Sequence, residues 1–182
     1  MKSKVQVVAL LAVSLFAGRG IAQDPVTDLQ EFAWMVGTWT AESELHQDHE
    51  VLGKAGTKAK ITATIRWGAG KKALLTTGTM EAGGKSVESI IRIVSVDPIT
   101  SAVVNYTVND RGGLGKTHSY FHDSESPYIW RVPFNYADEG RQMTGLAVVK
   151  KLGRDSYSHH SVRITVNGAD TEDFPLVTWH RK

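Results

Sequence analysis

The stretch Ile61-Thr62-Ala63-Thr64-Ile65-Arg66-Trp67 alternates apolar and polar side chains without a break. Successive side chains of a β-strand point to opposite faces, so the apolar set would face a core, whereas Thr62, Thr64 and Arg66 would face water. This period of two predicts a half-buried strand, and hence a sheet with one buried and one solvent-exposed face.

Similar runs recur on both sides of this stretch. Each is rich in Val, Ile, Thr, Trp and Tyr and ends at a cluster of Gly, Asp, Asn or Pro, which is typical of strands separated by turns. The pattern predicts about ten strands, at residues 36–46, 58–67, 72–80, 86–96, 101–109, 115–122, 127–134, 141–151, 156–166 and 172–181.

The connections between these runs are short turns, and no long helical pattern separates them, which excludes parallel βαβ units. The chain is therefore predicted to be all-β, a single antiparallel up-and-down barrel of about ten strands, with a sandwich as the alternative. One short helix is expected from Val26 to Trp34, where Thr27 would act as N-cap and Gln30 would complete a capping box.

The beginning of the chain predicts export. Residues 1–4 carry two lysines, Val5 to Gly18 form an apolar run, and Gly20-Ile21-Ala22 is a small-x-small cleavage site. We expect residues 1–22 to be a secretory signal peptide and residues 23–182 to form one lipocalin-like β-barrel domain, periplasmic or secreted after cleavage near Ala22. The run is too short to span a bilayer, so no membrane insertion is expected.

Composition narrows the function classes further. Removal of residues 1–22 leaves 18 basic and 19 acidic residues, so the mature chain has no excess of positive charge. We therefore expect no nucleic-acid partner, because such partners are attracted by a basic surface. The absence of cysteine excludes disulfides and thiolate metal sites. No nucleophile elbow or histidine cluster with ligand spacing is evident, so we assign no catalytic residue and no metal site, and the chain is expected to be a binding protein rather than an enzyme.

The segment Phe32-Ala33-Trp34-Met35-Val36-Gly37-Thr38-Trp39 places a Gly-x-Trp motif at the entry to the first strand. It resembles the opening motif of the calycin superfamily, and is most similar to secreted bacterial lipocalin-like proteins of unknown function. The hairpin at 96–100 and the ending Thr178-Trp179-His180-Arg181 agree with that group. The resemblance implies that Trp39, following Gly37, closes the barrel floor and is covered by Arg181.

A barrel of about ten strands is wide enough to hold a ligand, and several strand residues are candidates to line its interior. Arg92 alternates with Ile90 and Val94, so it faces inward unless the strand has the opposite orientation, in which Ile91 and Ile93 face inward. The other candidates are aromatic residues and histidines on strands with apolar neighbours, namely Tyr106, His118, Tyr120, His122, Trp130 and His160.

These residues support two hypotheses beside simple core filling. The first is a small, mainly apolar ligand, anionic if Arg92 faces the interior, because arginine grips carboxylates with two hydrogen bonds. The second rests on the strand count, which is closer to the nitrobindin-like branch of calycins than to true lipocalins. That resemblance implies a haem held by an imidazole from His118, His122 or His160, with oxidant-handling activity. The sequence leaves the oligomeric state open.

Overall fold

The computed structural model describes residues 25–117, 119–123, 126–138 and 140–182. Two short 3₁₀ helices and twelve strands make up this part of the chain: η1 (Leu29–Met35), β1 (Gly37–Glu44), β2 (Lys58–Gly68), η2 (Ala69–Lys71), β3 (Ala73–Ala82), β4 (Lys85–Val96), β5 (Val103–Asn109), β6 (Leu114–Thr117), β7 (Phe121–Asp123), β8 (Ser126–Asp138), β9 (Arg141–Lys151), β10 (Ser156–Val166), β11 (Ala169–Asp170) and β12 (Val177–Arg181).

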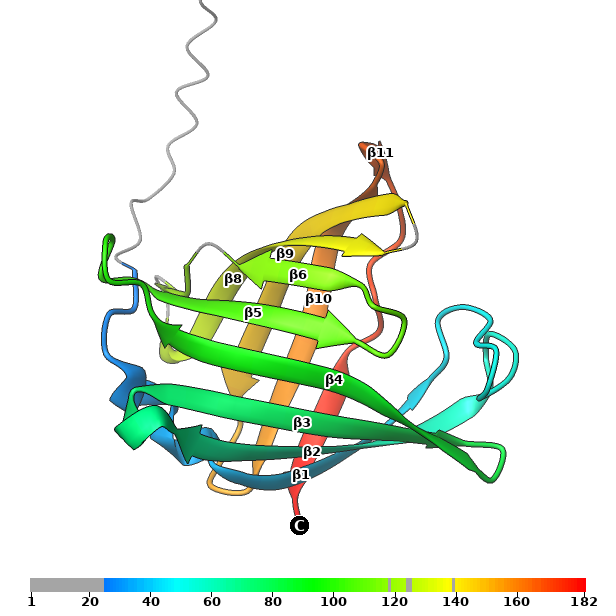
Figure 1. Ribbon diagram of the computed structural model, residues 1–182, viewed down its shortest axis with the longest axis horizontal. Helices are drawn as coiled ribbons and strands as arrows, with labels where there is room; N and C mark the ends of the chain where they lie inside the picture. The colour runs from blue at the N-terminus through cyan, green and yellow to red at the C-terminus, as the bar shows by residue number, and fades with distance from the viewer. Residues whose placement is uncertain (1–24, 118, 124–125, 139) are drawn as a thin grey trace, which may run out of the picture.

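Ten of these strands form a closed antiparallel barrel (Figure 1). Each strand from β1 to β6 pairs with the next along the chain, β6 pairs with β8, and β8, β9 and β10 follow in order. The ring closes because β12 lies between β10 and β1. The prediction of an all-β, single antiparallel barrel of about ten strands is confirmed, and the alternative of a sandwich is wrong.

The region predicted as one strand over 115–122 is divided in the structure. β6 ends at Thr117, and Tyr120 instead donates its backbone N–H to Val103 and accepts one from Val26. Val26 also accepts the backbone N–H of Val103, so it is hydrogen-bonded to both residues, and its side chain is fully buried. The short β7 then pairs with β8 outside the barrel ring, as β11 does with β10.

The predicted helix at 26–34 is present in a shorter form, as the 3₁₀ helix η1 (Figure 1). The N-cap is Asp28, whose carboxylate accepts the backbone N–H of Gln30 at 2.8 Å, so the prediction of Thr27 as cap is wrong. The reason is that the backbone of Val26 is held by hydrogen bonds to Tyr120 and Val103 and that Asp28 is still extended, so the helix begins at Leu29.

The two ends of the barrel differ. At the end covered by η1, which we call the floor, a cluster of aromatic and aliphatic side chains is packed tightly. At the opposite end, the mouth, the segment 45–57 contributes Leu45 and Leu52 to a second, smaller apolar cluster with Ala59 and Ala82. Among the described residues, no helix is long and apolar enough to cross a membrane.

Candidate functional site

The register of the strands places Arg92 on the inner face of the barrel. Arg92 is opposite Thr76 of β3 and Thr107 of β5, and the side chains of both threonines face the interior of the barrel. Its neighbours Ile91 and Ile93 point outward and remain 49% and 44% exposed. The alternative orientation, with Ile91 and Ile93 in the interior, is therefore wrong.

A chain of hydrogen bonds holds the Arg92 guanidinium in place. Its Nε donates to Thr107 Oγ1 at 3.3 Å, and this hydroxyl donates to Asn105 Oδ1 at 3.2 Å. Asn105 Nδ2 in turn donates to the phenolic oxygen of Tyr120 at 2.8 Å. Because Asn105 and Tyr120 are both buried, this chain connects Arg92 to a rigid part of the core.

The terminal nitrogens of Arg92 have a different environment from its Nε. Within the part of the chain that the structure describes, Arg92 forms no ion pair, and Thr107 is its hydrogen-bond partner. Arg92 is half-buried, so its charge is only partly solvated. Burying a cation without a counter-charge is unfavourable, and a planar guanidinium can bind a carboxylate with two parallel hydrogen bonds. The site is therefore suited to an anion.

The wall opposite Arg92 is formed by β10, which lies five strands away in the ring of ten. Tyr157 and His159 of β10 face inward, opposite Trp179 and Val177 of β12. Burial, together with the nearby charges of Arg92 and His160, lowers the pKa of His159 to about 4. Burial also raises the pKa of Tyr157, which Arg92 partly opposes. Both groups are therefore neutral near pH 7.

The floor beneath these polar groups is aromatic. Trp34 of η1 stacks on Trp130, with ring centres 5.5 Å apart, and meets Trp39 and Tyr157 edge to face at 6.1 and 5.7 Å. Phe32 adds a further stack on Trp130 at 5.1 Å. Such offset and edge contacts are favourable for aromatic rings. The 3₁₀ helix therefore seals this end of the barrel.

Above the floor the inner face is only partly filled. Several inward residues remain half-buried: Ile61, Ala147 and Val149, of which the last two pack against the floor cluster, and Met80, which packs against the apolar cluster of the mouth. Solvent therefore reaches the inner face from the mouth. A groove of about 750 Å³ lies at this end of the barrel, between the ends of β1 and β2, the β3–β4 hairpin and Pro175 to Val177.

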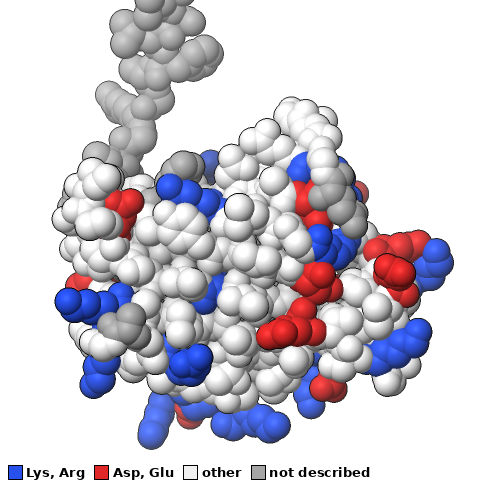
Figure 2. All heavy atoms as spheres, in the orientation of Figure 1, with Lys and Arg blue, Asp and Glu red and all other residues white. Residues whose placement is uncertain are grey.

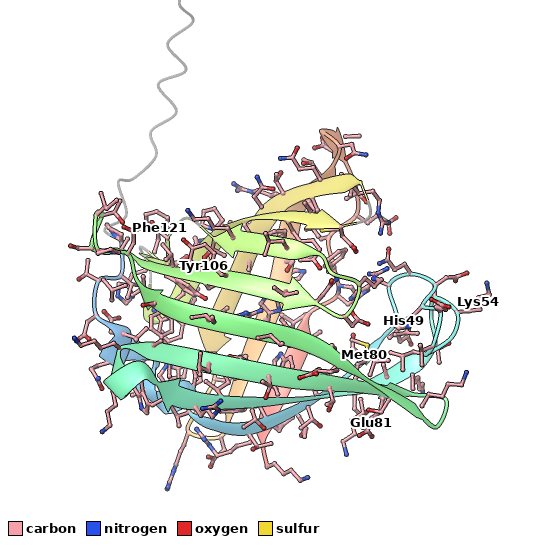
Figure 3. All side chains as sticks on the ribbon, viewed as in Figure 1. His49, Lys54, Met80, Glu81, Tyr106 and Phe121 are labelled. Atoms are coloured by element: carbon pink, nitrogen blue, oxygen red, sulfur yellow. The ribbon has the colours of Figure 1, made fainter. Side chains whose placement is uncertain are left out.

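The segment 45–57 lies across the mouth and is attached to three other segments. His49 Nε2 lies 2.6 Å from Asp110 Oδ2 in the β5–β6 turn, and Gln47 accepts a hydrogen bond from Arg141 at 3.0 Å. His46 stacks on Phe174 with ring centres 4.7 Å apart. Figure 3 shows His49 and Lys54 on this segment, at the same end of the barrel as Met80.

Two of the predicted tyrosines have different positions. Tyr120 is buried and takes part in the hydrogen-bond chain to Arg92. Tyr106 (Figure 3) is 45% exposed on the outer face of β5, opposite Ile93 and Lys116, so its predicted place in the interior is wrong. The alternation of Val104, Tyr106 and Val108 gave no sign of this, because the outer face of β5 is itself apolar.

The remaining predicted residues lie away from Arg92 or outside the described residues. Trp130 is buried between Phe32 and Trp34 in the floor, where it stacks on protein rings. His122 lies on β7, and its Nε2 is 2.8 Å from Glu31 of η1, so it ties the helix to the sheet. His118 lies outside the described residues.

His160 was predicted to face inward, and this prediction is wrong. Its neighbours His159 and Ser161 face inward, opposite Val149 and Ala147 of β9. Alternation counted backwards from Ile164 would point His160 inward, but the register between β9 and β10 shifts after Val162. A bulge inserts an extra residue and inverts the alternation on one side of it. His159 was therefore missed, although it alternates with Tyr157 and Ser161.

Acidic and imidazole side chains do not gather into a metal-binding group anywhere in the described parts of the chain. Interior donors for a ligand are instead the guanidinium of Arg92, the hydroxyl of Tyr157 and the neutral imidazole of His159. This arrangement can bind an anion at one wall and accept or donate single hydrogen bonds at the other.

Comparisons with known proteins give a likeness of fold alone. No family model matches the chain, and no curated protein matches its sequence. Among solved structures, the crystal structure of Rv2717c from M. tuberculosis is similar, with a TM-score of 0.58 and 11% sequence identity. The similarity covers 87% of this chain and 99% of that one. It supports a barrel fold of this kind.

Proposed function

We propose that the protein binds a small, mainly apolar molecule with an acidic group inside the barrel, and that Arg92 receives the acid. The observation that carries this proposal is the half-buried guanidinium of Arg92 on the inner face, held through Nε by Thr107. A bound carboxylate would supply the missing counter-charge through the terminal nitrogens. The apolar part would lie against Ile61, Ala147 and Val149, which line the inner face.

Affinity for a charged probe and for its neutral analogue tests this proposal. Decanoate and decanol have the same chain length, and each can be titrated as a competitor of a fluorescent apolar probe. The wild-type protein should prefer decanoate by about tenfold or more, since a charge-assisted pair contributes more than about 1.4 kcal/mol. Equal affinity for the two compounds would contradict the proposal.

Substitution of the arginine identifies the site. Arg92→Met should raise the Kd of decanoate by about tenfold and leave that of decanol unchanged, because the aliphatic stem is replaced by a side chain of similar length. Arg66→Met is the matched control, since Arg66 lies on the exposed face of β2. If both variants bind decanoate as the wild type does, the acid does not bind at Arg92.

Haem binding is the second candidate, and one observation favours it. His159 is an inward imidazole, and its lowered pKa keeps it in the neutral form in which histidine donates to a metal. A haem would supply iron chemistry toward oxidants, and His159 would hold it on the β10 wall. Haem titration should then produce a Soret band that His159→Ala abolishes and His160→Ala preserves. A protein that gives no Soret band with haem supports the acid-binding function alone.

We also propose that this binding takes place outside the cytoplasm, because the N-terminal segment has the composition of a signal peptide. Cleavage after Ala22 would leave a chain that begins at Gln23. N-terminal sequencing of the protein from the periplasmic fraction or the medium should give Gln-Asp-Pro-Val. A full-length chain in the cytoplasmic fraction would contradict this part of the proposal.

A further inference from the structure

The outer face of β4, β5 and β6 carries a continuous group of exposed apolar side chains, which we call the outer patch. Within it, Ile91 pairs with Val108, Ile93 with Tyr106, and Val108 with Leu114 across neighbouring strands. Directly opposite residues of an antiparallel pair have side chains about 5 Å apart on the same face. The five side chains therefore form one surface rather than scattered contacts. Their exposed fractions are 49% (Ile91), 44% (Ile93), 45% (Tyr106), 41% (Val108) and 61% (Leu114).

The outer patch is large for a protein surface. Five large side chains that are each about half exposed amount to several hundred Å² of apolar area, the size at which a patch marks an interaction site. In Figure 2, which looks onto β4, β5 and β6, the centre of this face is largely free of charged side chains, and acidic residues gather toward the mouth end. A surface of this kind is stabilised when a partner covers it.

Charged side chains of opposite sign lie at the two ends of the outer patch. Lys116 is level with Tyr106, and its ammonium is 5.5 Å from the centre of that ring. Lys72 lies at the same end, where its carbonyl accepts a hydrogen bond from Ser95 of β4. Glu88 and Asp110 lie at the other end, toward the mouth. The exposed charges are thus Lys72 and Lys116 at one end and Glu88 at the other, while Asp97 lies near Lys116 and Asp110 is paired with His49.

We propose that the outer patch is the interface of a homodimer, in which two copies pack these faces against each other. A twofold axis that runs across the strands places the basic end of each copy over the acidic end of the other. The same patch on the two copies is therefore complementary to itself. A stable interface takes about 800 Å² from each partner, so the apolar centre and the charged ends would both contribute. An anionic lipid surface fits less well, because Glu88 and Asp110 would be repelled from it.

Sedimentation of the purified protein tests the dimer directly. The wild type should sediment as a dimer at micromolar concentrations, and Ile93→Lys should raise the dimer dissociation constant by at least about tenfold, because it buries a charge at the centre of the interface. Ile99→Lys is the matched control, since Ile99 is 91% exposed in the turn after β4 and lies outside the outer patch. A wild-type protein that is monomeric throughout, or an Ile93→Lys variant no weaker than Ile99→Lys, overturns the proposal.

Charge reversal distinguishes a second copy from other partners. Lys72→Glu combined with Lys116→Glu should weaken the dimer several-fold, because both ends of the patch are then acidic. Addition of Glu88→Lys to the same chain should restore much of the affinity. A failure of this restoration argues against the proposed orientation of the two copies. Binding of a monomeric wild type to phosphatidylglycerol vesicles, lost in Ile93→Lys, would assign the patch to a membrane surface instead.

Discussion

Arg181 lies directly over Trp39, with its guanidinium carbon 4.3 Å from the centre of the indole ring. Its Nη1 and Nη2 donate to the carbonyls of Val36 and Trp34 at 2.8 and 2.7 Å, and its Nε donates to Asp155 at 3.0 Å. One side chain thus joins the last strand to the 3₁₀ helix and covers the fully buried tryptophan.

We expect Arg181→Met to lower the free energy of unfolding by about 3 kcal/mol, because three charge-assisted hydrogen bonds and a cation–π contact are lost. Arg154→Met, at an exposed position in the β9–β10 turn, should have little effect. Urea denaturation followed by tryptophan fluorescence measures both variants. A loss no greater than that of Arg154→Met would show that Arg181 does not stabilise the floor.

The interior imidazole predicts a specific pH dependence of stability. The pKa of His159 is about 4 in the folded protein and 6.5 in the reference state, so between these values the unfolded chain binds a proton that the folded chain does not. Stability is therefore highest above pH 6.5 and falls as the pH decreases toward 4, by up to about 3 kcal/mol from this residue.

A comparison of variants isolates this contribution from that of the carboxylates. His159→Gln should lose less stability than the wild type between pH 7 and pH 4, whereas His160→Gln should stay close to the wild type, because the charge of His160 is the smallest of the three causes that lower the pKa of His159. Arg92→Met should also reduce the loss, because the Arg92 charge helps to lower the pKa of His159. Thermal unfolding at a series of pH values measures this. Identical pH profiles of the two glutamine variants would contradict the burial of a neutral His159.

Thr107 is expected to set the orientation of Arg92. Thr107→Val keeps the shape of the side chain but removes the oxygen that accepts from Arg92 Nε and donates to Asn105. We expect the Kd of decanoate to rise about fivefold, since the guanidinium loses one of its hydrogen-bonded restraints. Thr77→Val, at an exposed position on β3, is the control. An unchanged affinity in Thr107→Val would show that Arg92 does not need this support.

The segment 45–57 should depend on its contact with the β5–β6 turn. Asp110→Ala removes the partner of His49 while leaving the bonds from the Val51 and Leu52 amides to His49 Nδ1 intact. Amide hydrogen exchange should accelerate several-fold in this segment and remain unchanged in the strands. Glu50→Ala, at an exposed position in the same segment, serves as the control. Equal exchange in the two variants would show that the contact does not hold the segment.

The fold could be predicted from the sequence because its signals are local. The alternation in residues 61–67 agrees with the structure, in which Ala63 and Ile65 are buried and Thr64 and Arg66 are exposed. Side-chain direction along a strand follows from backbone geometry alone, and turns follow from residues that tolerate positive φ. The approximate strand count and the antiparallel order follow from these two facts and the short connections, whereas the pairing of β12 with β10 and β1 decided between a barrel and a sandwich.

The interior site was decided by tertiary structure. Both faces of β4 and β5 carry apolar residues, so alternation alone left Arg92 with two orientations and placed Tyr106 on the wrong face; only pairing with Thr76 and Thr107 settles the direction. On β10, a regular strand would point His159 and Ile164 to opposite faces, because they are five residues apart. The bulge after Val162 turns both of them inward. Register and bulges arise from contacts between strands that are distant in sequence, so the periodicity of a single strand does not predict them.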